Sequence, residues 1–98
     1  MKCKSLSRFF GNFANPTKLE IITLLKDKPM CVNEMVKSIQ EEQSKISHNL
    51  KKLVDCHILT VKQNGKLRIY SLNTDTVLPI LNLVKKHVQC HCKCGCNQ

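Results

Sequence analysis

Four cysteines alternate with other residues in the segment Cys90-His91-Cys92-Lys93-Cys94-Gly95-Cys96, and His87 lies just before it. Residues two apart share one side of an extended strand, so four thiols can converge there, whereas a helix would scatter them around its axis. We therefore expect a preceding helix to end near Cys90. Thiolate-rich ligand sets select soft or borderline ions, namely copper(I), cadmium, lead, arsenite or zinc. Cys-x-Cys units are less typical of structural zinc than Cys-x-x-Cys units, which favours a soft ion.

Two other interpretations of these thiols remain open. Cysteines close to Lys85, Lys86 and Lys93 are favoured as thiolates, so oxidation of Cys90–Cys96 to disulfides is a rival, redox-based switch. A disordered tail that only buffers metal is the other alternative. The seven cysteines of the chain are odd in number and bunched at one end, which argues against a structural disulfide framework.

The charge balance indicates a polyanionic partner. The 98 residues carry 16 Lys+Arg against 7 Asp+Glu, a formal net charge of +9, which favours phosphate contacts and hence nucleic acid. No apolar run approaches the roughly 20 residues that span a bilayer, and residues 1–11 lack a secretory signal. We therefore expect a soluble, cytoplasmic chain with no membrane partner. The sequence shows no acid/base pair, nucleophile elbow or phosphate loop, so we do not expect an enzyme.

Amphipathic helices are expected near both ends of the chain. Leu6, Phe9, Phe10 and Phe13 recur at helical spacing. A last helix is expected from about Asp75 to Gln89, with an apolar stripe of Val77, Ile80, Leu81, Val84 and Val88. A single domain of this length leaves much of its surface exposed, so we expect these helices to pair with each other and with those of a homodimer partner.

The middle of the chain predicts three further helices. Asn15-Pro16 is a helix start, with Asn as cap and Pro at the first position, and this helix runs to about Lys26. A short helix covers 32–39, and a longer one runs from Gln43 to about Cys56 with Ile46, Leu50, Leu53 and Val54 facing inward. The outer face of this longer helix carries amides, hydroxyls and cations, which contact base edges and phosphates when a helix enters the major groove. These side chains belong to Gln43, Ser44, Lys45, Ser47, His48, Lys51 and Lys52.

Two strand-like runs, 58–63 and 66–71, flank Asn64-Gly65. This dipeptide is typical of a type I′ hairpin turn, which needs a positive φ at both positions. The hairpin carries Lys62, Lys66 and Arg68 near its tip. Three helices followed by a basic hairpin predict an α+β, mostly α, winged helix-turn-helix with a two-stranded wing and N- and C-terminal dimerisation helices.

Several segments, in order over roughly residues 5–89, resemble the ArsR/SmtB family of metal-responsive winged-helix repressors. Phe13-Ala14-Asn15-Pro16-Thr17-Lys18-Leu19-Glu20-Ile21 is similar to the family's first motif, and Met30-Cys31-Val32-Asn33-Glu34-Met35 resembles its cysteine box. Residues 43–53 resemble its recognition helix, and residues 64–72 resemble its wing.

The resemblance implies a homodimer that binds a palindromic operator in double-stranded DNA and leaves it when metal binds. Gln43, Ser44, Lys45, Ser47, His48 and Lys51 are then expected to contact bases or phosphates, with Lys66 and Arg68 reaching the DNA backbone or minor groove from the wing. Half-sites about 34 Å apart would suit two recognition helices in successive major grooves.

The family's metal positions are only partly matched. In the cysteine box Cys31 remains and Asn33 replaces the second thiol, so Cys31 is expected to need a partner such as Cys3. His87 and Cys90 fall at two positions of the family's zinc site on the last helix, and their spacing can chelate. Cys56 resembles one of the cysteines that some cadmium and lead sensors carry.

The sequence therefore predicts two parts. Residues 1–89 form the DNA-binding and dimerisation domain, and residues 90–98 form a cysteine-rich tail for metal or redox chemistry. The predicted function is a metal-responsive repressor whose metal ion, zinc, cadmium, lead, copper(I) or arsenite, is held by residues drawn from Cys90, Cys92, Cys94, Cys96, His87, Cys3 and Cys31.

Overall fold

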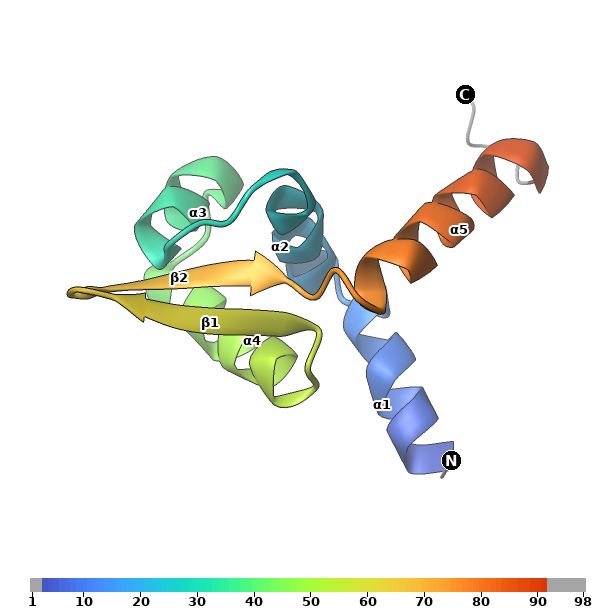
Figure 1. Ribbon diagram of the computed structural model, residues 1–98, viewed down its shortest axis with the longest axis horizontal. Coiled ribbons are helices and arrows are strands. Elements are labelled where there is room, and N and C mark those ends of the chain that lie inside the picture. Colours follow the sequence, from blue (N-terminus) through green and yellow to red (C-terminus); the bar gives the residue numbers. More distant parts are fainter. Residues whose placement is uncertain (1–2, 92–98) are drawn as a thin grey trace.

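The computed structural model describes residues 3–91, with side chains from residue 6 onward. Its elements follow the predicted order, and Figure 1 shows a body of helices and a hairpin from which α1 and α5 project at one end. The elements are α1 (Cys3–Ala14), α2 (Pro16–Asp27), α3 (Val32–Ile39), α4 (Gln43–Asp55), β1 (Leu59–Asn64), β2 (Leu67–Leu72) and α5 (Val77–His91). The predicted winged helix-turn-helix is confirmed. No helix in this part of the chain is long and apolar enough to cross a membrane.

Local signals in the sequence fix where the body helices start and end. Asn15 caps α2, because its side-chain oxygen accepts a hydrogen bond from the backbone N–H of Lys18 at 3.0 Å. The Glu34 carboxylate accepts one from the backbone N–H of Cys31 at 3.1 Å, which fixes the start of α3. Gln40, in the left-handed conformation with φ of 63°, ends α3 and turns the chain toward α4.

The hairpin turn lies one residue later than predicted. Its loop is Gly65-Lys66, and of the residues flanking the turn only Gly65 has a positive φ, of 65°, as in a type II′ rather than a type I′ turn. The observed register places buried Leu59 opposite buried Leu72 and continues to the base of the hairpin, where the backbone N–H of Asn73 donates to the backbone oxygen of Ile58 at 3.0 Å. A turn at Asn64-Gly65 would pair Leu59 with Tyr70 instead.

The wing is anchored to the body by a short third segment that the sequence did not reveal. Met30 pairs with Tyr70 as an isolated bridge, with N–H···O distances of 3.0 and 2.8 Å. This pairing ties the segment that leads into α3 to β2. Because both residues are buried, the wing and the start of α3 share one rigid support.

The core fills the space between α2, α3, α4 and the base of the hairpin. Its fully buried members come from each of these elements, and from the start of α5 through Val77. They are Ile21, Ile22, Met35, Ile46, Leu50, Leu53, Ile58, Leu59 and Val77. The predicted inward face of α4 is thereby confirmed, with Val54 half-buried at its edge.

The apolar stripe predicted on the last helix is only partly covered. Val77 is buried, and Leu78 and Leu81 pack against the core. Ile80 lies beside Leu6, Phe9 and Phe10 of α1. Further along α5, Leu83, Val84 and Val88 are 67%, 51% and 39% exposed, so pairing of α1 with α5 inside one chain covers only the first turns of α5.

Candidate functional site

One face of α4 is entirely polar and solvent-exposed. Its residues do not touch the core, because the opposite face of α4 holds Ile46, Leu50 and Leu53. Asn49 is also turned inward, and its side-chain amide donates to the backbone oxygen of Lys45 at 3.0 Å, which stiffens the middle of the helix. The exposed predicted DNA-contact residues on this face are Gln43, Ser44, Lys45, Ser47, His48 and Lys51.

The cations of α4 differ in how they are engaged. The Lys45 ammonium lies 3.3 Å from the Glu41 carboxylate, an exposed i, i+4 ion pair. Such exposed pairs are weak and exchange readily for a phosphate contact. Lys51 makes no ion pair within residues 6–91 and is open to a polyanion.

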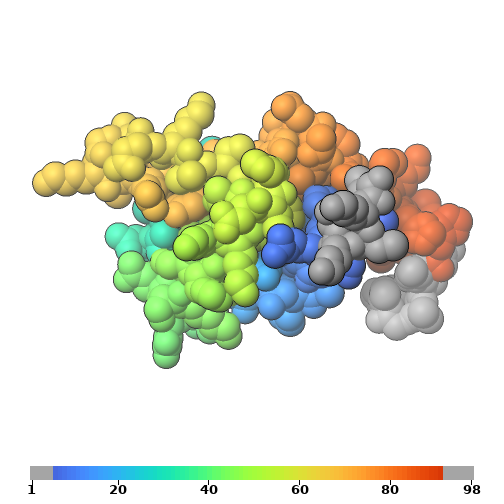
Figure 2. Space-filling model, turned by 90° about the horizontal axis from the view of Figure 1, so that it is seen from below, coloured from blue at the N-terminus to red at the C-terminus, as the bar shows by residue number. Residues whose placement is uncertain are grey.

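The structure brings the wing cations to the start of α4. Lys66, Arg68 and Gln43 line one hollow of about 220 Å³, together with Asn33 and Cys31 of the α3 start. Figure 2 shows α4 and the hairpin on one face of the molecule. The polar face of α4 and the basic wing therefore form a continuous surface, as DNA binding by this fold requires.

The carboxylate beside Cys31 is held in its charged form. The pKa of Glu34 is lowered, first by the hydrogen bond from the backbone N–H of Cys31, then by the Cys31 side chain, with smaller contributions from Lys28 and Lys37. The effect belongs to the capping of α3 and creates no acid or base poised for catalysis.

The predicted metal ligands fall into separate places. His87 and Cys90 lie exposed on α5, and the rings of His87 and His91 are 4.9 Å apart, so these three residues share one side of the helix. Cys31 is half-buried and free at the start of α3. Cys3 is the first residue of α1. Cys92, Cys94 and Cys96 lie outside the described residues.

The predicted ligands that the structure describes, on α1, at the start of α3 and on α5, belong to separate elements and do not form a common site within residues 3–91. In Figure 1, α3 and α5 lie at opposite ends of the molecule, and α1 and α5 diverge from their junction. In the described part of the chain no group of three or more His, Cys, Asp or Glu side chains is arranged to hold a metal ion. α5 includes Cys90 and His91, and the helix end predicted near Cys90 falls at the edge of the described residues, so it stays a prediction.

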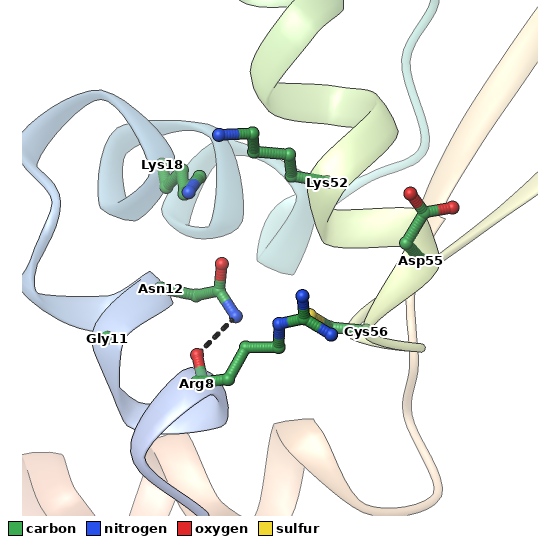
Figure 3. Close-up of a pocket in the computed structure, with 7 residues that line it drawn as sticks. All are labelled: Arg8, Gly11, Asn12, Lys18, Lys52, Asp55 and Cys56. Carbon is green, nitrogen blue, oxygen red and sulfur yellow. Dashed lines mark hydrogen bonds between the residues drawn. The ribbon is translucent and has the colours of Figure 1, made fainter. Parts of the chain in front are cut away.

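Cys56, at the end of α4, lies beside a hollow that sequence reasoning missed. Figure 3 shows this hollow between α1, α2 and α4, with Arg8, Asn12, Lys18 and Lys52 around it. These residues are far apart in the sequence and belong to no motif. The only signal for them was the excess of positive charge, which does not locate a site.

Comparisons with known proteins agree with this architecture. Residues 15–61 match the family model described as "Bacterial regulatory protein, arsR family". The arsenical resistance operon repressor of Staphylococcus xylosus is 32% identical over 97 residues, which cover 95% of this chain and 93% of that protein.

Two solved structures share the fold. NolR from Sinorhizobium fredii matches with a TM-score of 0.76 and 25% identity, over 85% of this chain and 83% of that one. The Mycobacterium bovis domain Mb0332, described as a homodimeric winged helix-turn-helix DNA-binding domain, matches with a TM-score of 0.84 and 20% identity, over 92% and 83%.

The sequence match to a repressor spans nearly the whole of both chains, and the fold, the exposed polar face of α4 and the basic wing are those of a DNA-binding regulator rather than an enzyme. The chain belongs to the ArsR/SmtB family of winged helix-turn-helix transcriptional repressors.

Proposed function

We propose that the chain is a metal-responsive repressor. In this proposal a metal-free homodimer binds a palindromic operator in the cytoplasm, and a soft or borderline metal ion held by cysteine thiolates releases it. The observation that carries the DNA-binding half is the continuous surface made by the polar face of α4 and the cationic wing. The relative from Staphylococcus xylosus, named as an arsenical resistance operon repressor, supports the metal-responsive half.

The polar face of α4 suits the major groove. Gln43, Ser44 and Ser47 offer amide and hydroxyl groups for base edges or phosphates, and His48 adds a ring nitrogen. Lys45 and Lys51 supply phosphate contacts, while Lys66 and Arg68 would meet the adjacent backbone or minor groove. In a symmetric dimer the two half-sites would lie about 34 Å apart.

The exposed apolar residues of α1 and α5 support a homodimer. Leu6 and Phe10 on α1 are 46% and 53% exposed, and the outer turns of α5 leave Leu83 and Val84 67% and 51% exposed. Apolar side chains clustered on two projecting helices are typical of a covered interface. A second copy of the chain is the occupant that matches the two-fold symmetry of an operator.

The cysteine-rich end of the chain is the proposed sensor. Thiolates from Cys90, Cys92, Cys94 and Cys96 would close around the ion with His87, and the domain boundary would lie between residues 89 and 90. Cys31 and Cys3 lie on other elements than α5, at the starts of α3 and α1. They would take part across the dimer interface or as a separate site.

Metal can release the operator only if it binds the DNA-free arrangement more tightly. A coupling free energy of about 1–3 kcal/mol between the two ligands lowers operator affinity by roughly 5–150-fold. Because α5 lies on the proposed dimer interface, metal closure at its end would change the packing of the two α5 helices. The spacing of the two α4 helices would change with it.

The test is a titration of zinc, cadmium, copper(I) and arsenite into reduced protein bound to fluorescent DNA from upstream of its own gene. A Cys92→Ser/Cys94→Ser variant removes two tail thiols, and a Cys31→Ser variant is the matched control for a thiol on the body. Release of the parent and the Cys31→Ser protein, but not of the tail variant, would support the proposal and identify the ion.

Two outcomes would favour the alternatives. Operator binding that persists with all four ions but is lost when metal-free protein is mildly oxidised would move the signal to disulfide chemistry, which the exposed Cys90 thiol permits. Binding that is equally strong to unrelated DNA would favour a metal-buffering protein with incidental DNA affinity.

A further inference from the structure

The hollow between α1, α2 and the last turn of α4 gathers positive charge from three elements. It has a volume of about 470 Å³, and its lining includes Arg8 from α1, Lys18 from α2 and Lys52 from α4. The acidic residue in the lining is Asp55, so cations outnumber carboxylates three to one. In Figure 3 the side chains of Arg8 and Lys52 approach the hollow from its two sides.

The three cations are not neutralised by the protein. Within residues 6–91 the ion pair of the structure joins Lys45 to Glu41, on another part of α4, and neither Arg8, Lys18 nor Lys52 takes part in one. Like charges that face one hollow repel each other unless an anion lies between them. The lining thus carries an excess of positive charge that a bound anion would neutralise.

A buried amide is aimed into the same space. Asn12 is only 4% exposed, and its side-chain nitrogen donates to the backbone oxygens of Arg8 and Phe9 at 3.0 and 3.4 Å. These bonds turn its side-chain oxygen toward Lys18 and Lys52 (Figure 3), and no group within residues 6–91 donates a hydrogen bond to this oxygen. The oxygen is an acceptor suited to hold a lysine ammonium in place beside a bound anion.

We propose that this hollow binds an oxyanion of the phosphate class. A guanidinium can bind two phosphate oxygens at once, and two ammonium groups supply point charges to the others. The volume exceeds that of one phosphate, so a water-filled margin or a larger phosphorylated group fits as well. The phosphate could be a free ion or a backbone phosphate of bound DNA, and the two sources are separable by experiment.

Such a site would join two functional elements. Its ligand would connect the last turn of α4, through Lys52, to α1, through Arg8. An occupied site would therefore hold the helix proposed to read DNA against a helix proposed to form the dimer. Occupancy is expected to restrict their relative motion and to influence operator binding.

The first arm of the test uses inorganic phosphate without DNA. The full-length, reduced, metal-free protein is titrated with phosphate by calorimetry at constant ionic strength, in parallel with Arg8→Gln, Lys52→Gln and the control Lys28→Gln. Lys28 is an equally cationic, exposed residue outside the hollow. Loss of one charge-assisted contact is expected to weaken phosphate binding about tenfold or more in the first two variants. Circular dichroism melts confirm that each variant is folded.

The second arm rests on the proposed function, because it uses operator DNA. If the phosphate belongs to the DNA backbone, Arg8→Gln and Lys52→Gln each lower the slope of log affinity against log salt by about one, and Lys28→Gln does not. If the phosphate is a free ion, the first arm shows binding and the slope is unchanged.

The proposal is overturned if both variants match Lys28→Gln in both arms. Wild-type protein that binds no DNA would contradict the proposed function instead, and the phosphate titration alone would then decide whether the site exists. Free phosphate that binds all variants with equal affinity binds outside the hollow, and the salt slope of the operator arm then decides whether the hollow holds a DNA phosphate.

Discussion

The body of the molecule and α5 were both predicted from apolar patterns, yet they end in opposite environments. Ile46, Leu50 and Leu53 on α4 are 0% exposed, whereas Leu83 on α5 is 67% exposed. The helices α2, α3 and α4 surround a core that the hairpin closes, while α5 leaves that core after its first turns (Figure 1). One apolar pattern thus completes the core, and the other stays largely exposed beyond the first turns of α5.

The difference teaches that amphipathicity identifies a face to be covered but not the molecule that covers it. On α4 the partner elements lie in the same chain, and the polar face is left exposed to solvent. On α5 the apolar face itself is left free. A fold whose core takes in only the first turns of α5 can therefore carry an interface on the rest of that helix without disturbing the core.

The largest expected effect comes from shortening one leucine in each region, which tests whether α4 and α5 contribute differently to stability. Leu50→Ala removes a fully buried side chain and is expected to lower the free energy of unfolding by about 2–5 kcal/mol. Leu83→Ala, made on the exposed face, is expected to change the free energy of unfolding of the monomer by less than about 0.5 kcal/mol. Urea unfolding at low protein concentration measures both. Equal losses that do not depend on protein concentration would show that α5 belongs to the core.

A charge placed on α5 tests whether a second copy of the chain covers its exposed apolar face. Leu83→Glu places a carboxylate on the proposed interface and is expected to weaken dimerisation by about 1.5–3 kcal/mol, roughly 10–100-fold in the dissociation constant. Gln89→Glu, at an exposed and originally polar position on the same helix, is the control. Sedimentation equilibrium measures the monomer–dimer balance. Dimers unaffected by Leu83→Glu would place the interface elsewhere.

The sequence predicted the body well because its signals were local. Asn15-Pro16 specified the start of α2, and the spacing of Ile46, Leu50 and Leu53 specified the buried face of α4. The hairpin was found, but its turn was placed one residue early. Register depends on which residues pair across the strands, here Leu59 with Leu72, and not on the turn dipeptide alone.

The candidate sites were predictable to different degrees. The polar face of α4 and the wing cations could be located because each follows from one element, and their meeting through Gln43, Lys66 and Arg68 followed from the fold. The hollow around Arg8, Asn12 and Lys52 was not predictable, because three helices that pack at angles set by the core bring these residues together. The metal ligands remain a prediction from residue types and spacing.

Gly65 in the wing and Gly11 in α1 test whether each glycine is needed for its backbone conformation. A Cβ atom at Gly65 or at Gly11 would meet nothing within 4 Å, but Gly65 has a φ of +65° and Gly11 lies inside α1. Gly65→Ala is expected to cost about 1–2 kcal/mol through backbone strain. Gly11→Ala is expected to gain about 0.5–1 kcal/mol by favouring the helix. Thermal melts give both signs, and a neutral Gly65→Ala would mean that the turn is not fixed in this conformation.

The smallest effect concerns the carboxylate that caps α3 within the body. The hydrogen bond from Cys31 lowers the pKa of Glu34 in the folded chain, so the charged form stabilises the fold above the unfolded pKa. This contribution is lost as the pH falls through the lowered, folded pKa. Glu34→Gln is therefore expected to lower the melting temperature slightly at pH 7, and the difference from the parent should vanish in acid. Glu20→Gln, exposed on α2 and without a side-chain hydrogen bond in the described structure, is the control. A Glu34→Gln deficit that stays constant from neutral to acidic pH would show that the amide's shape, and not the charge of the carboxylate, is what the α3 start requires.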